Sequence, residues 1–368
     1  MTQVGEERID CAVVGAGVVG LACARALARS GREVLVLEAG DAVGAGISSR
    51  SSEVIHAGLY YPPGSLKAWA CRRGNRLLRA YAAERGVAFE MCGKLIVATD
   101  QAEEGQLAAL LENGRANGVS GLAPLSAAAA RAMEPALRCT AALLSADTGI
   151  IDSHGLLQSL HADLEEHGGT IALRTPVLGG RAEADGVRLS VGGAEPVRLL
   201  ARTVVIAAGL GACAVGRAMG LARVPADHLC KGNYFTLAGR MPFSRLVYPV
   251  PAAAGLGVHY TLDLAGHGRF GPDVEWIMAE DYRVDPARAE RFYGAIRRYW
   301  PDLADGALGP AYAGIRPKIS AAGEPVADFA LRGPADHGAA GVIALYGIES
   351  PGLTAALALA ERVEEMAR

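Results

Sequence analysis

The chain has 368 residues, of which 51 % are hydrophobic and 20 % charged, and its formal net charge is −3 at pH 7. This length favours two domains, and the balance of apolar and charged residues is typical of a globular protein with ample material for a core. The small net charge and the lack of a clustered Lys/Arg run exclude a global field that would recruit nucleic acid or an anionic membrane.

The seven cysteines include no CxxC pair, and their number is odd. This is typical of reduced, buried thiols in a cytosol rather than of a disulfide framework. The first ten residues are polar and lack a basic n-region, so we expect residues 11–21 to form a strand and turn, not a signal peptide. The uncharged runs at 11–24 and 203–216 are too short to span a bilayer. A cytoplasmic location is expected, and peripheral contact with the inner membrane is left open.

The sequence VVGAGVVG at residues 13–20 predicts a buried strand, a glycine turn and the start of a helix. Gly15 permits the tight turn, Gly17 lets the backbone approach a pyrophosphate, and Gly20 lets the helix pack close to the strand. The helix N-terminus then offers N–H groups and a partial positive charge to a diphosphate.

A second buried strand, at residues 33–38, ends in Glu38, which is placed to accept hydrogen bonds from a ribose diol. This combination indicates dinucleotide binding but does not separate NAD from FAD. A two-nucleotide reductase is disfavoured, because Gly209-Leu210-Gly211 lacks the spacing of a second fingerprint.

The remaining elements are predicted from periodicity, capping residues and turn signals. Ser350 is expected to be the N-cap of the last helix, with Pro351 as its first residue. Helices are predicted from Val18 to a C-cap glycine at Gly31, over 65–85 and 103–117, up to Met133, and over 156–167, 286–299 and 351–366; strands are predicted over 94–99, 170–174, 187–191, 204–209, 233–237, 257–262, 276–279 and 341–346.

These elements predict an α/β protein: a Rossmann-like cofactor-binding domain with an inserted α+β substrate domain built on an antiparallel sheet. Alternating strand patterns, several prolines and one long helix mark residues 226–312 as the inserted part. We expect the cofactor-binding domain to comprise 1–85, 145–225 and 313–368, and the substrate domain to comprise 86–144 and 226–312.

Four further segments resemble the L-2-hydroxyglutarate oxidase/dehydrogenase branch of the D-amino-acid-oxidase-like flavoproteins. They are SSRSSEVIHAGLYY at 48–61, GVHYT at 257–261, AGIRPK at 313–318 and GIESPGLT at 347–354. With the glycine turn, the resemblance covers nearly the whole chain. In one departure, the branch usually shows Asn-Ser-Gly before VIHAG, whereas this chain has Ser51-Ser52-Glu53. The extra carboxylate could alter the surroundings of a flavin, and it leaves the exact substrate open.

The resemblance implies FAD and the oxidation of a small 2-hydroxy acid to the 2-oxo acid by hydride transfer to flavin N5. L-2-hydroxyglutarate is the leading substrate. A glycine- or sarcosine-type amine or amino-acid oxidase and a flavin-binding protein without turnover are the alternatives. The electron acceptor (oxygen, a quinone or a carrier protein) and the oligomeric state stay open.

Noncovalent FAD is the favoured form. Related amine dehydrogenases attach the flavin through a histidine in a similar context, which makes a covalent link through His56 the alternative. Attachment through a late cysteine is excluded because no cysteine follows Cys230.

The resemblance makes Arg316 the leading catalytic-site residue. A guanidinium can hold an α-carboxylate with two parallel hydrogen bonds and so aim the α-hydrogen at the flavin. Lys318 could bind a second carboxylate. His56, whose ring titrates near neutral pH, could remove the hydroxyl proton, and His259 is its rival. Three tyrosines could line the pocket: Tyr60, Tyr61 and Tyr248.

The glycine turn and the resemblance together assign a set of cofactor-binding residues. Within it, the helix that begins near Ser350 is expected to direct its positive end at the reduced flavin. The set is Gly15, Gly17, Val18, Val19, Gly20, Glu38, Ala39, Ser48, Ser49, Ser52, His56, Ala57, Gly58, Leu59, Val177, Ala208, Gly209, Gly347, Ser350, Gly352, Leu353 and Thr354. No histidine pair shows metal spacing, so no metal site is predicted.

Overall fold

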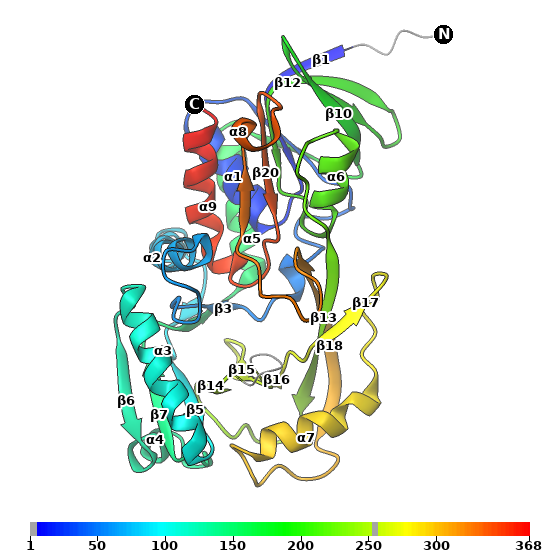
Figure 1. Ribbon diagram of the computed structural model, residues 1–368. Coiled ribbons are helices and arrows are strands. Elements are labelled where there is room, and N and C mark those ends of the chain that lie inside the picture. The colour runs from blue at the N-terminus through cyan, green and yellow to red at the C-terminus, as the bar shows by residue number, and fades with distance from the viewer. Residues whose placement is uncertain (1–5, 252–256) are drawn as a thin grey trace. The chain divides into compact units, whose positions relative to one another are not determined.

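The computed structural model describes residues 6–251 and 257–368. The chain divides into two compact units, whose elements are labelled in Figure 1. Unit 1 comprises Met1–Ser49, Ser153–Leu229 and Arg316–Arg368, and unit 2 comprises Arg50–Asp152 and Cys230–Ile315. Residues 50–85 and 145–152, which we assigned to the cofactor-binding domain, therefore cluster with unit 2. The role of each unit stays a prediction at this point.

Unit 1 is built on a parallel sheet, as the alternation of strands and helices predicted. Its parallel strands run in the order β20 (Val342–Tyr346), β12 (Val197–Ile206), β1 (Glu6–Val14), β2 (Val34–Leu37) and β9 (Thr170–Ala172). Three antiparallel strands extend it: β11 (Gly186–Val191) on β12, β10 (Val177–Glu183) on β11, and β19 (Ala330–Arg332) on β20.

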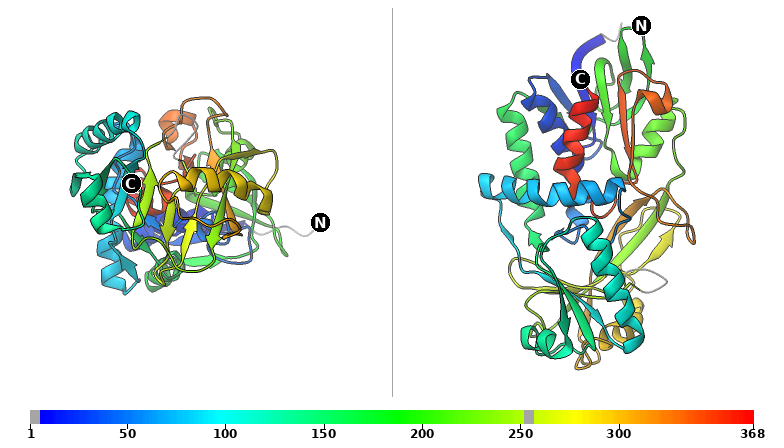
Figure 2. Two further views of the ribbon diagram at one scale, coloured as in Figure 1. Left: turned by 90° about the horizontal axis from the view of Figure 1, so that it is seen from below. Right: turned by 60° about the vertical axis from the view of Figure 1, so that its left-hand side comes forward.

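Helices cover both faces of this sheet, which explains why β2, β20 and the second half of β1 are apolar. On one face, α1 (Val18–Arg29) packs between α5 (Ser153–Glu166) and α9 (Gly352–Met366), as the views in Figures 1 and 2 agree. The other face carries α6 (Ala212–Ala218), whose Ala212 and Cys213 share a buried cluster with Ala12 and Val14 of β1. Three short helices complete the unit: η1 (Ser48–Arg50), η3 (Gly209–Gly211) and α8 (Pro334–His337).

Unit 2 holds most of a nine-stranded sheet. Five of its strand pairs are antiparallel, as predicted, and β14 (Leu246–Pro249) runs parallel to β5 (Lys94–Ala98). The order is β17 (Glu275–Ile277), β13 (His228–Leu237), β16 (Gly268–Phe270), β15 (Tyr260–Leu262), β14 (Leu246–Pro249), β5 (Lys94–Ala98), β7 (Ala141–Ser145) and β6 (Leu122–Ser126), with β18 (Leu308–Lys318) beside β13. A small sheet joins β3 (Val54–Ile55), β8 (Gly149–Ile151) and β4 (Phe89–Glu90).

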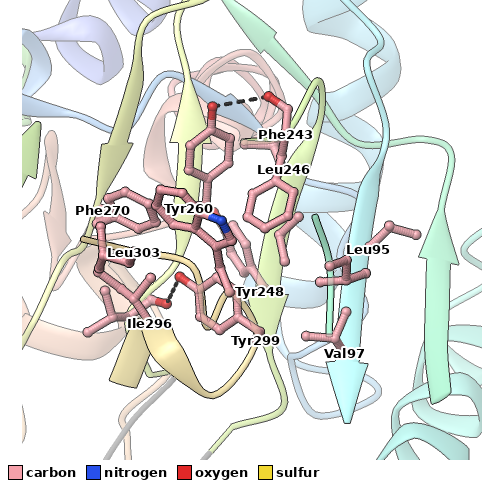
Figure 3. Packing of buried hydrophobic residues seen from close by; sticks show 14 of the residues in the cluster. Leu95, Val97, Phe243, Leu246, Tyr248, Tyr260, Phe270, Ile296, Tyr299 and Leu303 are labelled. Carbon is pink, nitrogen blue, oxygen red and sulfur yellow. Dashed lines mark hydrogen bonds between the residues drawn. The ribbon is translucent and has the colours of Figure 1, made fainter. Parts of the chain in front are cut away.

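Aromatic side chains form the main core of unit 2, and Figure 3 shows them packed against Leu95 and Val97 of β5. Two of its buried phenols are satisfied by backbone carbonyls: Tyr260 donates to Phe243 O at 3.1 Å, and Tyr299 donates to Val258 O at 3.0 Å. Satisfied polar groups in a close-packed core give the sheet a rigid frame. The covering helices are α2 (Leu66–Arg85), α3 (Glu104–Ala116), α4 (Ala127–Met133) and α7 (Ala289–Arg297), with η2 (Gln101–Glu103) and η4 (Pro286–Arg288); Figure 2 shows α3 along β5, β6 and β7.

Helix ends test the capping predictions most directly. The helix predicted over 65–85 is confirmed as α2: the Ser65 side chain accepts a hydrogen bond from Ala68 N, and Gly86 follows in the left-handed conformation at φ 70°. The prediction for the last helix is wrong by one residue. Pro351 is its N-cap, because Pro351 is not helical (φ −99°, ψ 41°) and its carbonyl accepts the first helical hydrogen bond, from Ala355 N at 2.9 Å.

No helix within the described residues is both long and apolar enough to cross a lipid bilayer.

Candidate active site

The glycine turn between β1 and α1 has no room for side chains. Gly15 has a φ of +105°, and a Cβ there would lie 2.7 Å from Ala207 O at the end of β12. A Cβ on Gly20 would lie 1.9 Å from Gly15 O. Atoms cannot approach so closely, so only glycine allows strand, turn and helix to pack at this distance. The arrangement matches the predicted pyrophosphate cradle.

Glu38 follows β2 and lies beside this turn. Its Oε2 accepts a hydrogen bond from Ala16 N at 2.7 Å, and its Oε1 accepts one from Gly40 N at 2.7 Å. A carboxylate has about four acceptor positions, so two remain for a ribose diol. Ser48 is also at the turn, where its Oγ accepts from Val18 N at 2.9 Å. The donors, the acceptors and the missing side chains fit a dinucleotide.

The predicted cofactor residues of unit 1 gather at one edge of the parallel sheet. Gly15 follows β1, Glu38 follows β2, Ala208 follows β12 and Gly347 follows β20. Carboxyl ends of parallel strands share an edge, which is where ligands bind in doubly wound sheets. Gly209 and Gly347 also line one small pocket, with Cys213, Asp227, Lys318 and other residues of this unit.

Two basic residues lie near the end of β18. Arg316 is half-buried and is followed by the buried Pro317. Lys318 forms an ion pair with Glu349, its Nζ lying 2.8 Å from Oε1, and the two side chains are only 15 % and 8 % exposed. The charge of Lys318 is therefore balanced within unit 1. This makes a second substrate carboxylate at Lys318 less favourable than the sequence indicated.

In unit 2, residues 56–61 are held along their backbone by asparagine side chains. Asn75 Nδ2 donates to His56 O at 3.0 Å, and Asn113 Nδ2 donates to Leu59 O at 2.7 Å. Asn117 Nδ2 donates to Gly58 O at 3.0 Å and to Tyr61 O at 2.8 Å. These asparagines come from α2, α3 and the end of α3. Sequence reasoning missed them, because an asparagine on a helix carries no mark of its distant acceptor.

A second missed residue is Lys94, the first residue of β5. Its side chain is completely buried. The ammonium lies 4.6 Å from the ring centre of Tyr60 and 4.7 Å from that of Tyr248. The Tyr248 ring in turn stacks on His259, with centroids 3.5 Å apart. The predicted residues Tyr60, Tyr248 and His259 therefore lie in one cluster with a lysine that the motifs did not reveal.

Burial sets the ionisation of this cluster. Desolvation, and then the charge of Lys94, lowers the pKa of His56 to about 3. Desolvation lowers the pKa of Lys94 to about 7. Burial raises the pKa of the Tyr60 and Tyr248 hydroxyls well above their usual range. At pH 7, His56 is therefore neutral and both tyrosines are protonated.

The carboxylate of Glu53, which departs from the family pattern, is balanced inside unit 2. Arg269 Nη2 donates to Glu53 Oε2 at 2.7 Å, and Arg269 Nη1 donates to Tyr312 OH at 3.2 Å. Tyr312 OH donates to Ser51 O at 2.9 Å. The backbone of Glu53 has a φ of 60°, a region that favours glycine. The usual glycine of the branch suits this backbone, and the glutamate gains an arginine partner instead.

The structure brings the predicted residues together in two groups, one in each unit. Ala39, Ser49 and Ser350 are exposed members of the first group. In unit 1 lie Gly15, Gly17, Val18, Val19, Gly20, Glu38, Ala39, Ser48, Ser49, Val177, Ala208, Gly209, Arg316, Lys318, Gly347, Ser350, Gly352, Leu353 and Thr354; in unit 2 lie Ser52, His56, Ala57, Gly58, Leu59, Tyr60, Tyr61, Tyr248 and His259.

One cluster of possible metal ligands occurs among the described residues: Asp163, Glu166 and His167. Arg25 donates a hydrogen bond to Asp163, and Arg29 lies 3.8 Å from it. The buried carboxylate is thus balanced by arginines, and we assign no metal to it.

Solved structures of flavoenzymes share this fold. The chain superposes with a TM-score of 0.89 on the FAD-bound L-alpha-glycerophosphate oxidase of Mycoplasma pneumoniae, at 24 % identity, covering 98 % of this chain and 95 % of that one. Glycine oxidase of Geobacillus kaustophilus gives a TM-score of 0.83 at 22 % identity, with the same coverage of 98 % and 95 %. These values establish the fold alone.

Sequence comparisons identify closer relatives. A mitochondrial L-2-hydroxyglutarate dehydrogenase of Arabidopsis thaliana is 45 % identical over 98 % of this chain and 83 % of its own length. An L-2-hydroxyglutarate dehydrogenase of Escherichia coli is 32 % identical over 74 % of this chain and 66 % of its own length. The family model described as FAD dependent oxidoreductase (DAO) matches residues 10–366. The chain therefore belongs to the DAO family of FAD-dependent oxidoreductases, and FAD is its cofactor.

Proposed function

We propose that this enzyme oxidises L-2-hydroxyglutarate to 2-oxoglutarate. The identity of 45 % over nearly the whole chain with the Arabidopsis L-2-hydroxyglutarate dehydrogenase carries the proposal. The cluster of unit 2 supports it, since basic and aromatic side chains suit a small acidic substrate.

The residues at the carboxyl edge of the unit 1 sheet would hold FAD. Gly15 and Gly17 leave space for the pyrophosphate, Glu38 accepts from the ribose, and Ser48 lies beside the first turn of α1. FAD, when bound, supplies a hydride acceptor at N5. We propose noncovalent binding. If the flavin stays with the acid-precipitated protein instead of the supernatant, the alternative link through His56 replaces it.

Arg316 is proposed to hold the α-carboxylate, and a histidine is proposed to take the hydroxyl proton. His56 is neutral at pH 7, so its ring has a lone pair for a proton. The burial and the nearby Lys94 charge that lower its pKa also make it a weak base. His259, stacked on Tyr248, is the second candidate. Replacing each histidine with asparagine and following flavin reduction against pH distinguishes them, because only the base removes an ionisation from the rate profile.

Anaerobic flavin reduction tests the substrate. The purified holoenzyme is mixed with L-2-hydroxyglutarate, D-2-hydroxyglutarate, L-lactate, glycine or sarcosine, and the flavin absorbance near 450 nm is followed. Bleaching by the first compound at the lowest concentration is expected. Bleaching by glycine or sarcosine alone would instead support an amine oxidase, and a flavin that stays oxidised with every compound would support a binding protein without turnover.

The electron acceptor and the compartment are separate questions. The sequence-based expectation of a cytoplasmic location stays a prediction, whereas the Arabidopsis relative is named as mitochondrial. Reoxidation of the reduced enzyme by oxygen, a soluble quinone or a dye identifies the acceptor class.

A further inference from the structure

Lys94 is a buried lysine that has no hydrogen-bond partner in the part of the chain that the structure describes. Its side chain has no exposed surface, and its Nζ has no hydrogen-bond partner in residues 6–251 and 257–368. Burying an ammonium without hydrogen bonds is among the most unfavourable arrangements in a protein. Such a residue is expected where a ligand supplies the missing partner.

The direction of the side chain follows from the strand. In β5, Leu95 and Val97 contact the aromatic core (Figure 3). Neighbouring side chains of a strand point to opposite faces, so Lys94, Ile96 and Ala98 point the other way. Ile96 and Ala98 pack on that face with Ala57 and Leu59, from the segment that carries His56. Lys94 is therefore directed toward the cluster already assigned to the substrate.

The surroundings of Lys94 suit a cation, and no carboxylate of the described residues forms an ion pair with it. The faces of two tyrosine rings, those of Tyr60 and Tyr248, lie 4.6 and 4.7 Å from the ammonium and attract positive charge. Two other lysines of low exposure, Lys318 and Lys231, do have partners. Lys318 is paired with Glu349, and Lys231 donates to Arg283 O at 2.5 Å and lies 3.8 Å from the Glu275 and Asp281 carboxylates.

We propose that Lys94 binds the substrate carboxylate that lies remote from the reacting carbon, and so selects dicarboxylic over monocarboxylic 2-hydroxy acids. This inference rests on the proposed function, in which the substrate is a dianion and Arg316 holds its α-carboxylate. Because Glu349 already balances the charge of Lys318, the second substrate charge needs another cation, and Lys94 has no hydrogen-bond or carboxylate partner among the described residues. A monocarboxylate would leave this ammonium buried and unpaired, which is a strong basis for rejection.

The first experiment uses the unaltered holoenzyme and ligands that cannot be oxidised. Glutarate, its monoamide glutaramate and butyrate are titrated into the oxidised enzyme, and binding is followed by the change in flavin absorbance. The monoamide keeps the length and polarity of glutarate but lacks one charge. We expect glutarate to bind at least ~30-fold more tightly than either monoanion, the usual order for a buried charge-assisted hydrogen bond. Equal affinities would overturn the inference.

The second experiment compares Lys94→Met with Lys94→Arg and with a matched control. Lys231→Met also removes a buried lysine of unit 2, but one already paired with Glu275 and Asp281. We expect Lys94→Met to lose the ~30-fold preference for glutarate over glutaramate and Lys94→Arg to retain part of it, since charge is the determinant. Lys231→Met should retain the preference in full. Circular dichroism and flavin content establish that each variant is folded.

The pH dependence of binding gives an independent readout. Because burial holds the pKa of free Lys94 near 7, dianion binding above pH 7 requires proton uptake. Glutarate affinity should fall up to ~10-fold per pH unit between pH 7.5 and 9, and butyrate affinity should not. His56 ionises near pH 3, and burial raises the pKa of Cys71, Tyr60 and Tyr248, so these neighbours keep their charge across this range. A flat glutarate profile would contradict the role of Lys94.

Failure of this inference can be told apart from failure of the proposed function. If L-2-hydroxyglutarate reduces the flavin but Lys94→Met keeps the glutarate preference, the function stands and the role of Lys94 is refuted. If another dicarboxylic acid, such as L-malate, reduces the flavin in its place and the preference depends on Lys94, the assignment of Lys94 stands and the substrate is corrected.

Discussion

Replacing Lys94 with methionine should stabilise the apo-protein at neutral and acidic pH. Burial lowers the pKa of this lysine from its ordinary value of 10.5 to about 7. At 1.36 kcal/mol per pKa unit, the charged form costs the folded state about 5 kcal/mol, an order-of-magnitude value. Methionine has nearly the length of lysine and carries no charge, so it removes this penalty and keeps most of the packing.

The sign of the pH dependence follows from proton counting. Between pH 7 and 10.5 the unfolded chain keeps a proton on Lys94 that the folded chain has lost, so wild-type stability rises with pH in this window. Below pH 7 both states are protonated, and the penalty is constant. The advantage of Lys94→Met should therefore be largest at pH 7 and below, and it should shrink by about 1.4 kcal/mol per pH unit above pH 7.

Urea unfolding of the two apo-proteins at pH 6.5, 8 and 9 measures this difference. The variant should be more stable by several kcal/mol at pH 6.5, and this advantage should be about 3 kcal/mol smaller at pH 9. A variant that is less stable than wild type at pH 6.5, or an advantage that does not change with pH, would refute the reasoning. Lys231→Met is the control and should lose stability, because it removes the hydrogen bond from the buried Lys231 ammonium to Arg283 O and its ion pairs with Glu275 and Asp281.

Three further predictions concern the backbone around the two groups of site residues. Gly20→Ala should lower stability by about 3 kcal/mol, and FAD retention with it, because the new Cβ would lie 1.9 Å from a carbonyl oxygen. Gly105→Ala in α3 is the control: its Cβ would meet no atom within 4 Å, so thermal unfolding of the holoenzyme should show a neutral or slightly stabilising effect. Glu53→Gly and Glu53→Ala both lose the ion pair with Arg269, but the glycine variant should be about 1 kcal/mol more stable, since only glycine relieves the φ of 60°; equal urea midpoints would contradict this. Asn117→Ala should cost about 1–2 kcal/mol and speed amide hydrogen exchange within residues 58–61, and unchanged exchange there would show that its two hydrogen bonds do not hold the segment.

The features that sequence predicted correctly are those fixed by short-range chemistry. Helix α2 begins after Ser65 and ends before Gly86, as predicted, because a hydroxyl cap and a left-handed glycine act within one turn of their own positions. The turn at Gly15 could be predicted for the same reason, since its spacing already implies a close approach of strand and helix. The last helix was misplaced by one residue because Ser350 and Pro351 both have properties of helix starts, and only the observed dihedral angles separate them.

The features that sequence missed depend on contacts across long separations. Asn117 reaches back 59 residues to the carbonyl of Gly58. Lys94 is the first residue of a strand that is otherwise apolar. The sequence does not indicate that this strand, β5, pairs with β14, which brings Tyr248 next to Lys94. The sequence showed that Glu53 is an extra carboxylate but not what balances it, because its arginine partner is 216 residues away. A local pattern can name a residue type, whereas its charge partner is decided by the fold.

Lys94 and Lys318 show why the partner matters more than the residue. Lys318 lies in a motif of the family, but Glu349 already balances its charge. Lys94 lies in no motif, yet the fold buries its ammonium, still partly protonated at pH 7, without a hydrogen-bond partner among the described residues, at a cost that a methionine would avoid. Marginally stable proteins retain such a cost at sites where function requires it. If Lys94→Met is more stable than wild type but no longer prefers glutarate over glutaramate, this one substitution will show that Lys94 lowers the stability of the protein and provides its specificity.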